Sequence, residues 1–446
     1  MSRFLMSAWP FPGHVYPQIA VAQALRDAGH EVAFFTGPAM RDTIEGEGFE
    51  LHPFRTIGEP WAPIHRMERR LPSRPGLLRT ETTALRRWLL HSIPAQVADL
   101  EPVIDDWRPD VIVSEPALLG PVVILGEKLE LPVALQATFL GPLIPGPDAP
   151  PLFGFGLRPP RTRAGRALGG AACKALDLLS AGFRRRIDRL RAEHGLGPLG
   201  CTVNEHTARM PLYLVGSVPE LDYGRADLPP TVHYVGRCTW QAPSDPATSA
   251  WLDRLPTGRR WVHVTEGTSA MGEPYLLRAA VEALAGLDVE VVMTTGRRGR
   301  QVELGSLPAN VHVTEFVRHD DLLPRCAAMV AGGGAGAVIA GLSAGVPMAI
   351  APVKWDQPDN ARRVAEAGAG LSLNASRITP ARLRAAVRLL LDDPRYAAAA
   401  RRLSRQLAAA GGPRRAAELL ARLAVTGGPV HETREDRLLA HVEEVG

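Results

Sequence analysis

Cysteine and lysine are scarce in this sequence. The chain of 446 residues has four widely spaced cysteines without a CxxC pair: Cys173, Cys201, Cys238 and Cys326. This spacing fits reduced thiols in a cytoplasmic protein better than a disulfide framework. Three lysines accompany 48 arginines, but the net charge is only +4. So small an excess for this length does not by itself indicate a nucleic-acid partner.

Long apolar runs and a secretion signal are also missing. No uninterrupted apolar run approaches the ~18 residues of a membrane span, because Glu127, Lys128 and Glu130 interrupt the best candidate. Trp9 and the prolines beside it break the start of the chain before a signal segment can form. The thirteen histidines show no HExxH or clustered ligand spacing, and no GxSxG elbow is present. We therefore expect a cytoplasmic protein with no membrane span, no metal and no serine nucleophile.

Two α/β domains are predicted from length and pattern. The chain is longer than a single hydrophobic core usually accommodates. Its 46% apolar and 22% charged residues are ordinary for a globular protein. Short apolar runs alternate with helical patterns in both halves, as in parallel α/β domains. The expected strands are 4–8, 31–36, 110–114, 133–136, 212–215, 232–235, 261–265, 289–294, 311–317, 328–331 and 348–352. We predict two Rossmann-like domains, residues 1–235 and 236–425, with a cleft between them and a tail helix over 426–446. Residues 138–170 are expected to form a long, functional loop.

A histidine follows the first predicted strand. His14 opens a helix that runs to about residue 28. Ligands of open parallel sheets bind at the carboxyl ends of strands, and an imidazole there can act as a general base because its pKa lies near neutrality. A structural role for His14 is the alternative. Glu115, at the end of the strand 110–114, is the candidate carboxylate that would orient the imidazole.

A glycine-rich turn in the second half predicts an anion site. It separates the strand 328–331 from a helix, and glycines there allow a ligand close to the backbone. The N–H groups at the helix start then attract an anion, usually phosphate. The polar residues after the next strand can hold sugar hydroxyls: Trp355, Asp356, Gln357, Asp359 and Asn360. One alternative is a turn packed for helix–strand contact. Another is a dinucleotide fingerprint, because Gly332, Gly334 and Ala337 satisfy GxGxxA, and this would indicate an NAD(P)-dependent oxidoreductase.

Three segments carry a resemblance to a known family. Residues 10–37 resemble the opening of the family-1 inverting glycosyltransferases, which is GHxxP followed by a helix and RGHxV. Residues 310–324 are similar to their nucleobase loop, and residues 334–364 to their donor signature, with its DQxxNA ending. The resemblance covers nearly the whole chain. It implies the GT-B fold of two facing Rossmann-like domains, the first binding an acceptor and the second a nucleoside-diphosphate sugar, without a metal or another cofactor.

The resemblance also implies roles for single residues. His14 would take the proton of the acceptor, and Glu115 stands where the family usually has an aspartate. The donor residues it implies, with two further candidates for phosphate charge (Arg297 and His319), are Thr268, Phe316, Val317, Gly334, Ala335, Gly336, Asp356 and Gln357. Gly332 replaces a histidine that commonly touches the phosphates. Val338 or Ala340 replaces a glutamate that holds ribose hydroxyls, which favours a thymidine-diphosphate (TDP) sugar over a UDP-sugar.

Apolar and aromatic residues of the first half suggest the acceptor. The candidates are Trp61, Trp88, Phe139 and Phe153, with Phe155 beside them. We therefore predict a metal-independent, inverting glycosyltransferase that moves a sugar to a small, largely apolar natural product, such as the aglycone of an antibiotic. A non-catalytic glycosyltransferase-like helper is an alternative alongside the oxidoreductase.

Overall fold

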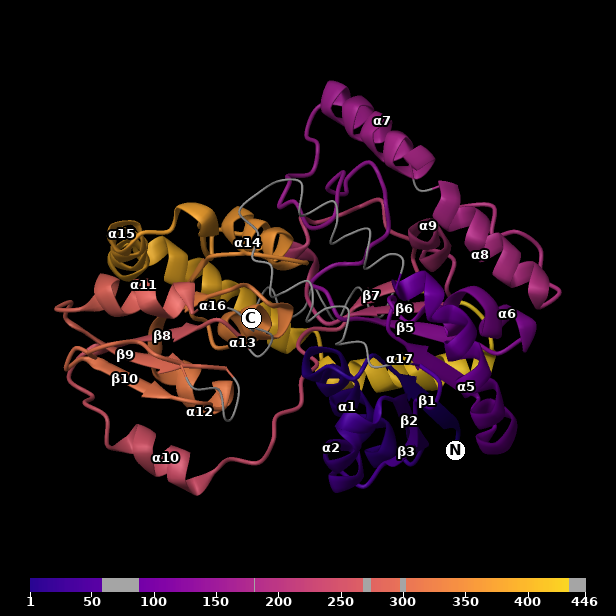
Figure 1. The fold of residues 1–446 in the computed structure, drawn as a ribbon, viewed down its shortest axis with the longest axis horizontal. Helices are drawn as coiled ribbons and strands as arrows, with labels where there is room; N and C mark the ends of the chain where they lie inside the picture. The colour runs from indigo at the N-terminus through magenta and orange to yellow at the C-terminus, as the bar shows by residue number, and fades with distance from the viewer. Residues whose placement is uncertain (58–87, 180, 268–273, 297–301, 433–446) are drawn as a thin grey trace.

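The structure is a computed structural model that describes residues 1–57, 88–179, 181–267, 274–296 and 302–432. In the described part, seven parallel strands form the first sheet in the order β3-β2-β1-β4-β5-β6-β7 (Figure 1). Their bounds are β1 Arg3–Ser7, β2 Glu31–Thr36, β3 Glu50–Pro53, β4 Val111–Ser114, β5 Val133–Ala137, β6 Leu212–Val215 and β7 Val232–Tyr234. The order reverses direction between β1 and β4, which pair directly. This reversal makes the carboxyl ends of β1 and β4 the expected ligand edge of the sheet.

The second sheet repeats this arrangement with six parallel strands among the described residues, in the order β10-β9-β8-β11-β12-β13. Their bounds are β8 Arg260–Thr265, β9 Val289–Thr294, β10 Val311–Thr314, β11 Cys326–Ala331, β12 Met348–Ile350 and β13 Gly370–Ser372. Here the order reverses between β8 and β11. Each domain therefore has one switch point, the place where α/β sheets bind ligands.

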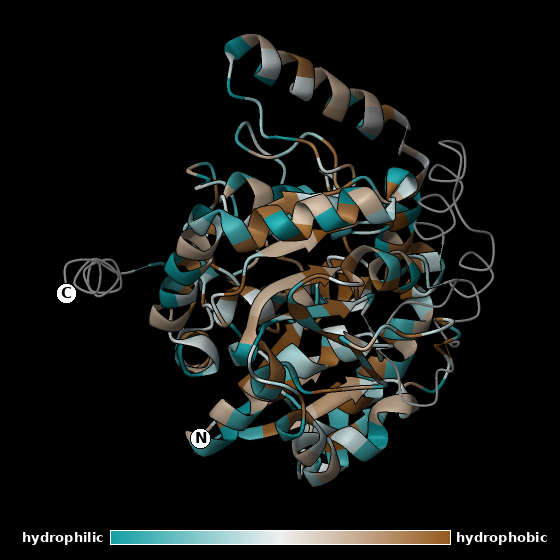
Figure 2. Ribbon diagram, turned by 90° about the vertical axis from the view of Figure 1, so that its left-hand side faces the viewer, coloured by the Kyte–Doolittle hydropathy of each residue, from teal (hydrophilic) through white to brown (hydrophobic). Residues whose placement is uncertain are grey.

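Helices cover both faces of both sheets because successive strand residues point to opposite sides. In the first domain, Leu5 packs on the face covered by α5 (Ile93–Trp107), and Phe4 packs on the face covered by α1 (Pro12–Asp27). The apolar strands consequently lie inside a shell of helices with hydrophilic outer surfaces (Figure 2). The other helices of the first half are α2 Arg41–Gly46, α6 Gly126–Lys128, α7 Arg163–Leu179, α8 Ala181–Glu193 and α9 Val203–Thr207.

The second domain follows the same plan. The helix α11 (Tyr275–Leu284) packs on one face of the sheet with α15 (Pro380–Asp392). The helices α13 (Ala335–Ser343) and α16 (Pro394–Ala409) pack on the other. The remaining helices are α10 Pro246–Asp253, α12 His319–Leu322, α14 Gln357–Glu366 and α17 Gly412–Thr426. In the described part of the chain, no helix is both long and apolar enough to cross a membrane.

The last described helix returns to the first domain. The side chains of Leu419, Leu420 and Leu423 on α17 are buried in the cluster that also holds Phe4 and Val15. Figure 1 shows α17, in yellow, beside the indigo helix α1. The predicted boundaries assign residues 412–425 to the second domain, but the packing of α17 places this segment on the first sheet. The tail helix predicted over 426–446 falls mostly outside the described residues.

All the expected strands are present, but the strand expected over 311–317 ends at Thr314 and the strand expected over 348–352 ends at Ile350. The expected strands 31–36, 212–215 and 289–294 have the predicted bounds. Two edge strands, β3 and β13, were not predicted. The long loop expected over 138–170 is shorter than predicted, because α7 begins at Arg163.

Candidate active site at the domain boundary

His14 is placed by the start of α1, at the carboxyl end of β1. Phe11 is the N-cap of this helix and Pro12 occupies its first turn, where the fixed φ of proline favours helix entry. The backbone N–H groups of His14 and Val15 both donate to the carbonyl of Phe11, at 2.9 Å and 2.9 Å. The imidazole is therefore held in the first turn, with 27% of its side chain exposed.

Glu115 lies next to His14, as predicted. It directly follows β4, the neighbour of β1 in the sheet, and its side chain is fully buried. One carboxylate oxygen contacts Nδ1 of His14 in a short hydrogen bond. The other accepts the backbone N–H of Trp9 at 2.5 Å. Both oxygens are thus occupied, so the carboxylate fixes the ring orientation and leaves Nε2 as the imidazole nitrogen available for chemistry.

The protonation of His14 depends on both domains. Burial alone would lower the pKa of His14, but the charge and hydrogen bond of Glu115 and the charge of Asp356 outweigh it, so the pKa is raised. Asp356 stands at the start of α14 in the second domain, and burial raises the pKa of its carboxyl to about 6. The two groups therefore interact electrostatically across the domain boundary.

The glycine turn forms the start of α13 at the switch point of the second sheet. Gly334 is the N-cap, Ala335 and Gly336 begin the helix, and in the described part of the chain no side chain caps it. The first amide groups of an α-helix have no partner inside the helix, so these N–H groups can bind an anion. A Cβ at Gly334 or Gly336 would meet nothing within 4 Å. The predicted phosphate cradle is therefore open on this side.

The two glycines before the helix are closely packed, and Gly333 more so than Gly332. Gly333 has φ +94°, and a Cβ there would lie 2.5 Å from Cγ2 of Ile350. At Gly332, where the family commonly has a histidine, a Cβ would lie 3.2 Å from the carbonyl oxygen of Glu266. A side chain at either position would have to displace its neighbours.

The residues after β12 are tied to each other and to the glycine turn. The side-chain amide of Asn360 donates to Asp356 at 2.7 Å and to the carbonyl of Gly333 at 2.9 Å. The side-chain oxygen of Gln357 accepts the N–H groups of Val353 and Lys354, at 2.9 Å and 3.2 Å. Gln357 can therefore meet a sugar only through its NH₂ group, whereas Asp356 keeps an acceptor oxygen.

The candidate nucleobase residues follow β10. Phe316 is half-buried, and Val317 packs with Leu322 in a small core. His319 begins α12, and its ring lies edge-on to His263, 5.8 Å away. Burial, followed by the charge of Arg237, lowers the pKa of His319 to about 4. A neutral imidazole can donate a hydrogen bond to a phosphate, but it adds no positive charge at neutral pH.

The aromatic candidates for the acceptor fall into two groups. Trp88 packs against the buried Trp9, with ring centroids 4.2 Å apart. Phe139 and Phe153 lie edge to face at 5.2 Å, and Phe153 is 44% exposed. The sequence did not single out Phe11, whose ring lies 5.1 Å from that of His14. Trp61, Thr268 and Arg297 lie outside the described residues.

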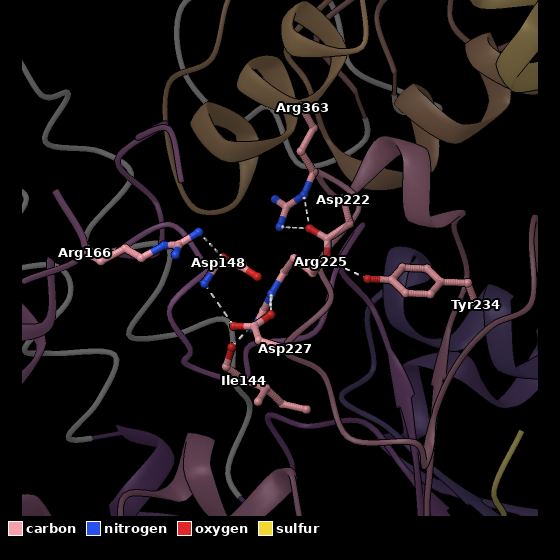
Figure 3. Close-up of polar contacts among 8 residues, drawn as sticks. All are labelled: Ile144, Asp148, Arg166, Asp222, Arg225, Asp227, Tyr234 and Arg363. Carbon is pink, nitrogen blue, oxygen red and sulfur yellow. Dashed lines mark hydrogen bonds and ion pairs between the residues drawn. The ribbon is translucent and has the colours of Figure 1, made fainter. Parts of the chain in front are cut away.

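Sequence patterns did not reveal the residues that join the domains. Arg363 on α14 forms a buried ion pair with Asp222 of the first domain at 2.7 Å, and Asp222 also accepts the hydroxyl of Tyr234 at 2.6 Å. Figure 3 shows this arginine pointing down from α14 onto Asp222, above a second pair formed by Arg225 and Asp227. The contact joins residues that are 141 positions apart in the sequence, so no local motif predicts it. Among the described residues, no group of three or more metal-ligating side chains is gathered.

Comparisons with known proteins agree with this architecture. Residues 12–139 match the N-terminal domain of glycosyltransferase family 28, and residues 278–423 match the C-terminal domain of erythromycin biosynthesis protein CIII-like proteins. The structure of the kitacinnamycin glycosyltransferase has a TM-score of 0.74 at 25% identity, covering 94% of this chain and 98% of that one. The fold is therefore that of the GT-B glycosyltransferases.

Sequence relatives narrow this class. The chain is 36% identical over 412 residues to 4'-demethylrebeccamycin synthase of Lentzea aerocolonigenes, covering 92% of this chain and 96% of the relative. It is 29% identical over 432 residues to 10-deoxymethynolide desosaminyltransferase of Streptomyces venezuelae, covering 90% and 92%. The chain belongs to the family-1 glycosyltransferases of antibiotic and natural-product biosynthesis. The glycine turn lies within the matched C-terminal domain, and the dinucleotide interpretation, which implied an oxidoreductase, is set aside.

Proposed function

We propose that this glycosyltransferase moves a sugar from a nucleoside diphosphate, TDP rather than UDP, to a small apolar natural product, with inversion at the anomeric carbon. One observation carries the proposal. The His14–Glu115 pair stands at the switch point of the first sheet, and the charge of Asp356, at the start of α14, acts on its imidazole. Asn360 of the same helix donates to the carbonyl of Gly333, beside the uncapped start of α13. This connection supports a single site in which an acceptor base faces a phosphate cradle.

His14 acts as the general base. Nε2 takes the proton of the acceptor group while the acceptor atom attacks the anomeric carbon on the face opposite the diphosphate. The imidazolium that forms is stabilised by Glu115, whose buried carboxylate is already paired with Nδ1. General-base catalysis of this kind contributes roughly 10²–10⁴-fold to a rate.

The start of α13 stabilises the departing diphosphate. As the bond between the anomeric carbon and the phosphate oxygen breaks, negative charge collects on the leaving group. The N–H groups of Gly334, Ala335 and Gly336, together with the helix dipole, meet this charge without reorganisation. This contribution is the physical basis for proposing a metal-independent enzyme.

The helix α13 itself favours TDP. Val338 and Ala340, which stand where a ribose-binding glutamate is common, are buried apolar residues of this helix. They offer no acceptor to a ribose 2'-hydroxyl, which deoxyribose lacks. A rhamnosyltransferase of the same fold, 23% identical, is known in complex with thymidine diphosphate, which makes TDP the first nucleotide to test.

Thermal shift with TDP and UDP tests the donor site first. Binding to the folded state at 100 times Kd stabilises a protein by about 2.7 kcal/mol, so a clear rise in Tm is expected with TDP and a smaller one with UDP. If neither nucleotide stabilises the protein at saturation, the donor assignment fails.

A panel of nucleotide sugars and aglycones, analysed by mass spectrometry, tests the reaction. Aklavinone, 10-deoxymethynolide and the spinosyn aglycone are suitable acceptors, because they are named for similar proteins. We expect a product carrying one sugar, with inverted anomeric configuration, and a loss of about 100-fold or more in His14→Ala. Unchanged turnover in that variant would exclude His14 as the base.

A further inference from the structure

A loop of the first domain reaches across to α14. The backbone N–H groups of Gly154 and Gly156 donate to the two carboxylate oxygens of Asp359, each at 2.7 Å. Asp359 lies in the first turn of α14 and is only 3% exposed. A buried carboxylate whose two oxygens accept bonds from the other domain is an anchor for the loop rather than a ligand for a sugar.

The loop fits this anchor only because it carries two glycines. Gly154 has φ +84° and Gly156 has φ +61°, a backbone region that other residues rarely adopt. A Cβ on Gly154 would lie 3.0 Å from the carbonyl oxygen of Trp355, and one on Gly156 would lie 2.8 Å from that of Pro358. The loop therefore lies directly on the backbone at the start of α14.

Charged residues extend the contact along α14. Nε of Arg362 donates to the carbonyl of Gly156 at 2.9 Å. Glu366, one turn further on, pairs with Arg158 at 2.5 Å and with Arg161 at 2.9 Å. Both arginines are largely exposed, so these pairs contribute little energy and the buried Asp359 contacts dominate.

This connection joins candidate acceptor residues of the first domain to candidate donor residues of the second. On the first domain, Phe153 immediately precedes Gly154 and packs edge-on against Phe139. On the second, Asp356 and Gln357 stand within one turn of Asp359 on the same helix. Asp359 is therefore a direct connection between the start of α14 and the loop that carries Phe153.

We propose that Asp359 is a positioning residue that couples the two substrates, by holding the aromatic acceptor loop on the helix that binds the donor sugar. The proposal rests on the proposed function. A donor that orders the start of α14 also orders Phe153. By reciprocity, an acceptor held by Phe153 raises the affinity for the donor. Asp359 thereby sets acceptor affinity without touching either substrate.

Hydrogen exchange in the full-length protein, with TDP as the probe, tests the coupling. In the wild type, we expect the amides of residues 152–157 to exchange slowly and TDP to slow them further. In Asp359→Asn the carboxamide keeps the shape but offers one acceptor oxygen instead of two. We expect these amides to exchange at least tenfold faster in this variant, with no response to TDP, while TDP still raises Tm.

Kinetics separate positioning from a loss of fold. With an aglycone that the wild type glycosylates in the panel, Asp359→Asn should raise the acceptor KM about tenfold and leave the KM of the TDP-sugar within twofold. Asp393→Asn is the matched control, because Asp393 also accepts a backbone N–H at a helix start, in α16, and should change neither value.

Two results would overturn the proposal in distinguishable ways. If TDP binds but residues 152–157 exchange alike in the wild type and in Asp359→Asn, the coupling is wrong and the donor assignment stands. If TDP fails to bind the wild type, the proposed function and the coupling fall together.

Discussion

At the scale of single residues, Glu115 sets both the orientation and the protonation of His14. Its two oxygens are occupied by the imidazole Nδ1 and by the backbone of Trp9. Burial lowers the pKa of His14, but this carboxylate and the charge of Asp356 together outweigh burial, so the pKa lies above its ordinary value of 6.5. Because a general base must be neutral, activity is expected to rise with pH as His14 loses its proton above pH 6.5.

Glu115→Gln should therefore change both the rate and its pH profile. Without the carboxylate, burial dominates and the pKa of His14 falls, so the acid limb of kcat/KM moves to lower pH. The plateau rate should fall by about 10²-fold or more, because an amide cannot stabilise the imidazolium. The measurement is kcat/KM between pH 5 and 9 with an acceptor that the wild type glycosylates.

A surface pair of the same kind provides the control. Glu50 on β3 lies 3.5 Å from His52 and is 59% exposed. Glu50→Gln should leave both the acid limb and the plateau unchanged. An acid limb that stays in place in Glu115→Gln would show that another group controls the protonation step.

At the scale of the element, the strand–turn–helix unit around Gly333 depends on one backbone conformation. Gly333→Ala must adopt φ +94° and fit a Cβ 2.5 Å from Ile350. We expect this variant to lose about 1–3 kcal/mol of unfolding free energy and to bind TDP more weakly, because the turn is displaced. Gly334→Ala has open space and φ −61°, so we expect it to lose less, about 0.5–1 kcal/mol, because alanine is a poorer N-cap than glycine.

Urea denaturation and TDP titration of these two variants measure the difference. Equal losses of unfolding free energy in Gly333→Ala and Gly334→Ala would contradict the steric argument.

The same scale shows why the sequence predicted most strands but not all. Strands buried on both faces are continuous apolar runs, and 31–36, 212–215 and 289–294 have the predicted bounds. The two edge strands that were missed lack this signal: β3 has an exposed Glu50 and ends in Pro53, and β13 has three residues. Pro and Gly before Arg163 likewise concealed where α7 begins.

The site residues that could be predicted from the sequence are those that the order of the strands brings together. His14 and Glu115 were paired in advance because both follow strands of one parallel sheet, whose ends lie at one edge. Asp359 was predicted to hold sugar hydroxyls and Asp222 was assigned no role, because the partners of these two carboxylates lie 203, 205 and 141 residues away in the other domain. Such contacts depend on how the two domains meet, which local patterns do not encode.

At the scale of the whole molecule, the described chain passes between the domains in two segments, and these two segments are in contact. Gly236 follows the last strand of the first sheet, and a Cβ there would lie 2.4 Å from the carbonyl oxygen of Leu407 on α16. The N–H of Gly412, where α17 begins, donates to the carbonyl of Val235 at 2.7 Å. The outgoing and returning segments are thus packed together, which limits how the domains can separate.

The buried Arg363–Asp222 pair is the second restraint on that movement. Asp222 is fully buried and Arg363 nearly so. Removing one partner of such a pair leaves the other charge buried without an opposite charge beside it. We expect Asp222→Ala to lower the free energy of unfolding by about 3–5 kcal/mol. Asp222→Ala/Arg363→Met removes both charges and should recover much of this loss, which urea denaturation of the single and double variants would measure. Strictly additive losses would show that the two side chains do not interact, and the domains would then be held mainly by Asp359 and the crossing segments.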